Sequence, residues 1–153
     1  MQLIMRMHLW SRWLLDRGFK PVSRLMDGMI RVVCSARIPA EAQIHPTVRF
    51  SHNGLAVLIT RDCKIGPGCQ IGTHAILGSN WPKLGAPQIE ANAMIGPGAI
   101  VLGPVKVGKG SLVAANSVVL DDVPPGVLVA GNPAKIKKRD IDINAYLYPE
   151  SSM

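Results

Sequence analysis

Large apolar residues recur at a step of six along most of this chain. Thirteen positions follow the step: Ile38, Ile44, Phe50, Ile59, Ile65, Ile71, Leu77, Ile89, Ile95, Val101, Val107, Val113 and Val119. A small or β-branched residue stands four places after most of them, and glycine often follows directly. A step of six residues matches neither the helical period of 3.6 residues nor the strand period of 2 residues.

Each hexapeptide therefore predicts one short strand and one turn, with the large apolar residue pointing inward. Three such edges close a coil, and a coil buries its apolar residues only when another coil stacks on it. The sequence predicts a mainly β fold, a parallel β-helix. Residues 44–136 would supply about five coils of roughly 18 residues each.

A helical segment precedes the repeat. Trp10, Trp13 and Arg17 fall at helical spacing, Gly18 and Pro21 interrupt the pattern, and a second helix is expected over residues 22–33. Leu25, Met29 and Val32 share one side of that second helix. We expect both helices to pack on the coil end or on a neighbouring subunit, with weak contact to a membrane surface as the alternative. The predicted divisions are 1–37 (helical), 38–124 (β-helix) and 125–153 (exit segment and tail).

Composition narrows the class of protein. The 153 residues suffice for one domain, and no apolar run is long enough to span a bilayer. Arginines break the apolar N-terminus, which argues against a signal peptide. Cys63 and Cys69 fall at small inward positions, so buried thiols are expected rather than disulfides. We predict a cytoplasmic protein.

The net charge is +7, and the excess lies at the two ends of the chain. Nucleic acid is not expected as a partner, because the basic segments lack interleaved aromatic residues and a known binding motif. A short basic run such as 135–139 suits a phosphate-rich small molecule like coenzyme A.

The period breaks twice, and each break predicts a loop on the scaffold. From Phe50 to Ile59 the step is nine, so three extra residues protrude within 51–58. Between Leu77 and Ile89 we expect one edge to become a loop over residues 79–88. The first break carries His52, the side-chain type that exchanges protons near neutral pH, and we predict that it is a general base facing a groove between subunits.

The repeat resembles the hexapeptide-repeat acyltransferases over residues 38–139. The resemblance implies a left-handed parallel β-helix and a homotrimer. Four segments are similar to the serine acetyltransferase branch in particular: Ile44-His45-Pro46, Ser51-His52-Asn53-Gly54, Ile95-Gly96-Pro97-Gly98-Ala99 and Val129-Ala130-Gly131-Asn132-Pro133-Ala134-Lys135. That resemblance implies direct transfer from acetyl-CoA to a hydroxyl, with His52 as the catalytic base. It also implies an acetyl-CoA site at Gly78, Ser79, Pro97, Ala115, Lys135 and Lys138.

The chain departs from that branch on the acceptor side. Gln43 replaces the aspartate that orients the catalytic histidine, Ser51 replaces the aspartate before it, and 85–86 replace an Arg-His pair. We therefore expect a sugar or exopolysaccharide precursor as acceptor, with L-serine as the alternative. Gln43 is the expected orienting residue, and His45, Ser51 and His74 are predicted substrate-binding residues.

Two other classes of function stay open. A metal-dependent hydratase resembling gamma carbonic anhydrase needs three histidine ligands, and the spacings of 7 and 22 between His45, His52 and His74 do not resemble that family's. No metal is expected. An inactive trimer serving as an assembly module is the other possibility.

Overall fold

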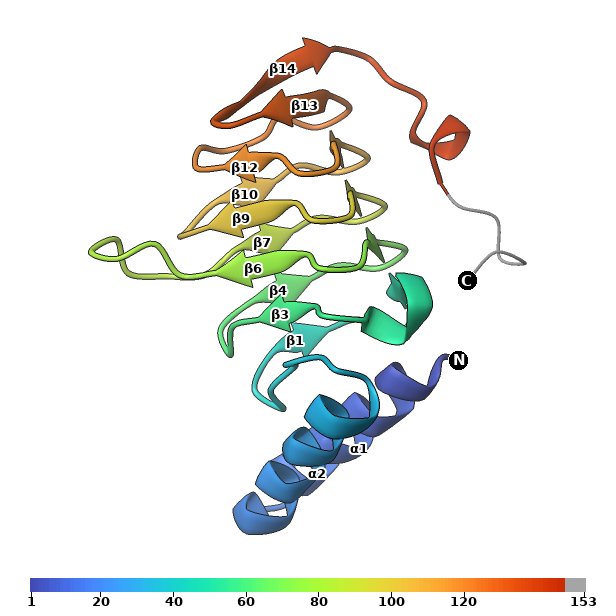
Figure 1. Cartoon of the computed structure of the whole chain (residues 1–153), viewed down its shortest axis with the longest axis vertical. Helices are drawn as coiled ribbons and strands as arrows, with labels where there is room; N and C mark the ends of the chain where they lie inside the picture. Colours follow the sequence, from blue (N-terminus) through green and yellow to red (C-terminus); the bar gives the residue numbers. More distant parts are fainter. Residues whose placement is uncertain (148–153) are drawn as a thin grey trace.

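The computed structural model describes residues 1–147, and in it the hexapeptide step builds a three-sided prism of parallel strands (Figure 1). The first face contains β1 (Gln43–Ile44), β4 (Lys64–Ile65), β7 (Gln88–Ile89) and β10 (Lys106–Val107). The second contains β2 (Arg49–Phe50), β5 (Gln70–Ile71), β8 (Met94–Ile95), β11 (Leu112–Val113) and β13 (Leu128–Gly131). The third contains β3 (Leu58–Ile59), β6 (Ile76–Gly78), β9 (Ile100–Leu102) and β12 (Val118–Val119). We name the corners between these faces 1–2, 2–3 and 3–1.

The prism is left-handed, as the resemblance implied. In Figure 1 the chain climbs from the helices towards β14, and the near strands β6, β9 and β12 point left as it climbs. The strands form four complete coils and part of a fifth, rather than the five expected. The difference arises because β14 (Ala134–Lys138) folds back antiparallel on β13 instead of starting another parallel edge.

The predicted inward positions form the core. All thirteen are at most 7% exposed, and Cys63, Cys69 and Ala93 at the small positions are fully buried. Glycine is required where corners of successive coils stack closely. A Cβ on Gly72 would run into the backbone nitrogen of Pro97 in the next coil. The period of six therefore sets both the core and the tight corners.

The second break is an insertion and not a lost edge. Leu77 lies in β6 on the third face and Ile89 lies in β7 on the first, so both neighbouring strands are present. The residues between them form an excursion at the 3–1 corner, which projects from the prism after β6 in Figure 1. The expectation that an edge becomes a loop was wrong. Leu77 and Ile89 are twelve residues apart but belong to consecutive edges, so the step contains the normal six residues and an insertion of six.

Two helices lie against the N-terminal end of the prism. They are α1 (Leu3–Asp16) and α2 (Lys20–Val33), separated at Gly18, which has φ +83°. The Gln2 amide fixes α1 to the first coil, because its Nε2 donates to Phe50 O at 2.6 Å and its Oε1 accepts from Phe50 N at 2.8 Å. Ile4 and Ile30 are fully buried there.

The side of α2 that carries Leu25, Met29 and Val32 is exposed, so within this chain it is not the packing side. Beyond β14 the chain forms one further turn, η2 (Ile143–Ala145). The end of the predicted tail, 148–153, lies outside the described residues.

Candidate functional site

The first break in the period forms an outward turn that carries His52. This turn, η1 (Ser51–Gly54), joins β2 to β3 at the 2–3 corner. His52 and Asn53 have φ values of +49° and +53°, a region that residues other than glycine seldom occupy. The chain leaves the prism edge here, and the His52 side chain is exposed.

The turn is held from below and from above. Gly54 is buried, and a Cβ there would lie 2.5 Å from Ile4 Cδ1 of α1. Leu55 O accepts a hydrogen bond from His74 N of the next coil at 2.9 Å. The outward position of His52 is thus fixed by contacts on both sides of its turn.

Several predicted site residues lie in one column along the 2–3 corner. His74 stands one coil above the His52 turn and is also exposed, with φ +60°. The column continues through Pro97, in the corner whose Gly98 N donates to Thr73 O at 2.8 Å, and then through Ala115. The structure therefore places the predicted base, one predicted acceptor residue and two predicted acetyl-CoA residues on the same edge of the prism.

The other predicted acetyl-CoA residues lie elsewhere. Gly78 ends β6 and Ser79 opens the excursion, both at the 3–1 corner across the third face from His52. Lys135 and Lys138 are exposed on β14, at the far end of the prism from the helices. Within one chain these residues do not form a single pocket with His52.

Within one chain Gln43 does not lie beside His52, so the chain by itself does not form the expected pairing. Gln43 belongs to β1 on the first face, whereas His52 lies at the 2–3 corner, which is opposite that face in a three-sided prism. The sequence places them nine residues apart, and those nine residues cross the whole second face. Sequence distance gave no sign of this separation.

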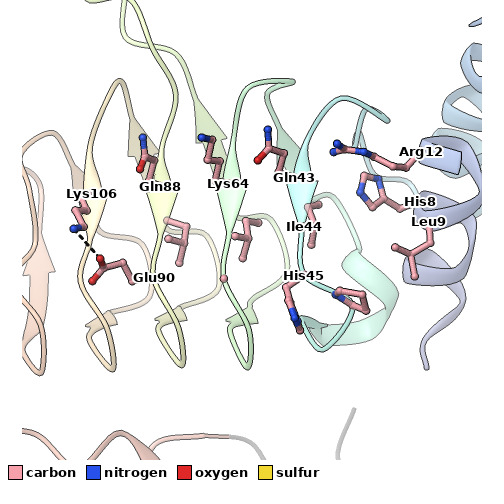
Figure 2. Close-up of a pocket in the computed structure, with 14 residues that line it drawn as sticks. His8, Leu9, Arg12, Gln43, Ile44, His45, Lys64, Gln88, Glu90 and Lys106 are labelled. Carbon is pink, nitrogen blue, oxygen red and sulfur yellow. Dashed lines mark ion pairs between the residues drawn. The ribbon is translucent and has the colours of Figure 1, made fainter. Parts of the chain in front are cut away.

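Gln43 instead lines a groove of about 640 Å³ along the first face, shown in Figure 2. The outward side chains of successive strands form its floor, and α1 closes one end. The lining residues that carry polar groups are His8, Arg12, Gln43, His45, Lys64, Gln88, Glu90 and Lys106.

His45 lies at the rim of this groove, at the 1–2 corner. Its Nδ1 is 2.8 Å from Thr47 Oγ1 and accepts from Thr47 N at 3.3 Å. Because Nδ1 is an acceptor, the Thr47 hydroxyl donates to it, while Thr47 Oγ1 accepts from Gly68 N at 3.0 Å. His45 therefore stabilises a corner, away from the His52 turn.

His8 was missed by the sequence analysis, which considered only the apolar and basic pattern of α1. It is 1% exposed, and its Nδ1 has no hydrogen-bond partner among the described residues. Burial, helped by the charge of Arg12, lowers the pKa of His8 from 6.5 to about 4, while a hydrogen bond to the Ala42 backbone opposes the shift. His8 is therefore neutral at neutral pH.

The opposite end of the groove carries an ion pair. Lys106 Nζ lies 2.7 Å from Glu90 Oε1, and Glu90 Oε2 accepts from Lys109 N at 2.9 Å. These hydrogen bonds lower the pKa of Glu90, and the Glu90 carboxylate raises the pKa of Lys106. Both groups are well solvated, so the pair contributes little to stability.

Arg37 is a second residue that the sequence analysis missed. It occupies the strand position below β3 on the third face, where its N donates to Val57 O at 2.8 Å and its O accepts from Ile59 N at 2.9 Å. Its side chain is exposed. The fold thus places a cation in the strand position next to the segment that follows the His52 turn.

Within residues 1–147, no group of three or more histidine, cysteine or acidic side chains is arranged to hold a metal. His52 and His74 share the 2–3 corner, but His45 lies at the 1–2 corner. One chain therefore does not bring these three histidines together.

Comparison with known proteins identifies relatives of this fold. Residues 86–121 match the family described as bacterial transferase hexapeptide (six repeats). The chain is 35% identical to the serine acetyltransferase of Bacillus licheniformis over 152 residues, which are 92% of this chain and 64% of that protein.

Solved structures agree with this relationship. A soybean serine acetyltransferase complexed with serine superposes with a TM-score of 0.82 and 32% identity, covering 88% of this chain and 56% of that one. A serine acetyltransferase in complex with CoA gives a TM-score of 0.81 at 28% identity, over 88% of this chain and 55% of that one. The chain thus spans between half and two thirds of the length of these relatives.

Proposed function

The chain is a hexapeptide-repeat protein homologous to serine acetyltransferases, and from that premise we propose that it is an acetyl-CoA-dependent O-acetyltransferase. The observation that supports this most is the similarity to a CoA-bound serine acetyltransferase over 88% of the chain. The shared part includes the prism on which the outward His52 turn is built.

We assign His52 as the general base of a direct transfer. Its imidazole takes the proton of the acceptor hydroxyl while the oxygen attacks the thioester carbonyl of acetyl-CoA. The tetrahedral intermediate collapses with cleavage of the C–S bond, and the imidazolium returns the proton to the departing CoA thiolate. The exposure of His52 on the 2–3 corner leaves room for both substrates to reach it.

The donor would lie along the column that rises from His52. Pro97 and Ala115 follow on the same corner, and Lys135 and Lys138 stand beyond them on β14. An extended ligand with its acetyl group at the first coil would direct its phosphates towards those exposed ammonium groups. Gly78 and Ser79, across the third face, would contact a donor bound to a neighbouring copy.

L-serine is the acceptor that the relatives favour. The soybean structure is complexed with serine, whereas the saccharide expected from the sequence finds no support among these relatives. A serine acceptor brings a carboxylate, and the exposed Arg37 offers a cation beside the segment that follows the His52 turn. We propose that Arg37 pairs with that carboxylate.

We further propose that the working unit is a homotrimer. The outward strand positions of the third face carry a row of apolar side chains, Leu58, Ile76, Ile100 and Val118, of which Leu58 is 38% exposed. A neighbouring copy over this face would bury the row and bring its own corner towards the His52 column. The cytoplasm stays our prediction for its location.

The test is release of CoA thiol from acetyl-CoA with L-serine, with ethanolamine and with a panel of sugars. We expect turnover with L-serine, a fall in kcat of about 10²–10⁴ for His52→Gly, and no change for Asn92→Gly. Asn92 is the matched control, because it is also a left-handed corner residue, with φ +57°, but lies at the 1–2 corner. Undiminished turnover in His52→Gly would exclude His52 as the base.

Arg37 is tested in the same assay. Arg37→Gln should raise the KM for L-serine roughly tenfold with a smaller change in kcat, because the lost cation binds a part of the acceptor that does not react. Ethanolamine, which lacks the carboxylate, should be insensitive to the substitution. Equal effects on both acceptors would remove Arg37 from the acceptor site, and no turnover with any acceptor would favour the inactive assembly module.

A further inference from the structure

The α1–α2 hairpin is attached to the prism by one side only. Ile4, Met5 and His8 of α1 and Ile30 of α2 are buried, and Ser11 Oγ donates to Asp27 Oδ1 at 2.6 Å between the helices. Figure 1 shows both helices beyond the first coil, at the end of the molecule. Side chains on their other side are exposed.

That other side carries large apolar side chains. On α1, Trp10 is 68% exposed and Trp13 is 51% exposed. On α2 a second stripe follows the helical period, and its exposed members are Val22, Leu25, Met29, Val32 and Val33. A shallow groove lined by Leu3, Arg6, Met7, Trp10 and Met26 joins the surfaces of the two helices. We call this surface the hairpin face.

Positive charge accompanies the apolar surface. The exposed cations of the two helices and their connection are Arg6, Arg17, Lys20, Arg24 and Arg31. Residues 1–33 contain only two acidic residues: Asp27 turns inward to Ser11, and Asp16 lies 3.6 Å from Arg12. The Arg17 guanidinium lies 3.9 Å above the Trp13 ring, which places a cation and an indole at the same level.

Tryptophan beside arginine, with aliphatic side chains between them, is the composition that the interface of an anionic membrane favours. The indoles and aliphatic groups enter the boundary of the acyl chains, while the guanidinium groups meet lipid phosphates. None of the described helices is long and apolar enough to cross a bilayer. Each has 14 residues, so each would be about 21 Å long, against roughly 30 Å for the hydrocarbon core.

We propose that the hairpin face is a docking surface for the anionic surface of a lipid bilayer, on which both helices lie in the plane of the interface. The charge of the face selects this occupant over a second copy of the chain, because two hairpin faces in contact would oppose two sets of cations. The prism would then stand away from the membrane with its first coil nearest the lipid. This binding is independent of acyl transfer and of the identity of the acceptor.

The test is flotation of the full chain with vesicles of phosphatidylcholine alone or with one quarter phosphatidylglycerol. We expect binding to the anionic vesicles, at least a tenfold weaker partition on neutral vesicles, and release from the anionic vesicles at 0.5 M salt. In a Trp81→Phe variant, the fluorescence of Trp10 and Trp13 should shift to the blue on binding. Equal partition on both vesicle types, or no partition, would overturn the proposal.

Two variants locate the surface. Trp10→Ser/Trp13→Ser and, separately, Leu25→Ser/Val32→Ser should each weaken partition roughly tenfold, with thermal unfolding unchanged because these side chains are exposed. Trp81→Ser is the matched control, since Trp81 is 83% exposed on the excursion far from the helices and its loss should leave partition unaltered. If either helix variant instead lowers the oligomeric state measured by sedimentation without lipid, the face is an interface between copies and the proposal is wrong.

Discussion

His8 should make the stability of this protein fall in mild acid. The perturbation is a change of pH from 7.5 to 4.5, compared between the wild-type chain and His8→Leu. Burial lowers the pKa of His8 in the folded protein to about 4, against 6.5 in the unfolded chain. Above pH 6.5 both states are neutral at this site, and the residue gives stability no pH dependence.

As the pH falls through 6.5, His8 binds a proton in the unfolded chain, whereas in the folded chain it stays neutral until about pH 4. Stability is therefore lost between these two values and levels off below them. A shift of 2.5 units, the difference between 6.5 and 4, corresponds to about 3 kcal/mol at 1.36 kcal/mol per unit. Most of this should already be lost at pH 4.5.

Urea unfolding followed by circular dichroism, at fixed protein concentration and ionic strength, measures the effect. The contributions of the acidic groups common to both proteins cancel in the comparison. Between pH 7.5 and 4.5 the free energy of unfolding of His8→Leu should therefore fall by about 2–3 kcal/mol less than that of wild type. His74→Leu removes an exposed histidine and is the control variant in the same titrations. Parallel pH profiles for wild type and His8→Leu would refute the argument from burial.

Three further predictions concern the scaffold and the site. Gly72→Ala should lower the free energy of unfolding by about 1–3 kcal/mol, because the added Cβ meets the Pro97 backbone. Gly28→Ala, on an open helix surface, should raise that free energy by about 0.5–1 kcal/mol, and urea titration checks both. Cys63 and Cys69 should react with a thiol reagent only after unfolding, since both are fully buried and burial raises their pKa to about 12 and about 11; rapid reaction of either in the native protein would contradict this. Gln43→Asp should leave kcat within about twofold of wild type, because Gln43 lies on the face opposite the His52 corner; a large gain in rate would show that another copy brings them together.

The sequence by itself determined the prism. A period of six gives each edge one inward residue, and every one of the thirteen predicted positions is buried in the prism. The departures from the six-residue step also located both breaks. Extra residues in a stacked coil protrude outward, because the coils above and below occupy the other directions. The exposure of His52 follows from that count and from the left-handed backbone of its turn.

Only the tertiary structure decided which residues meet. Gln43 and His52 are near in sequence but lie on opposite parts of the prism, while His74, 22 residues beyond His52, stands directly above its turn. Arg37 reaches the segment after that turn through a strand pairing that the repeat pattern did not reveal. His8 is buried by packing between helix and coil, and the two tryptophans of the same helix are left outside. A repeat fixes whether each side chain points into or out of its own edge. Which residues become neighbours in adjacent coils, and how a flanking helix is oriented, depends on the number of residues in each corner.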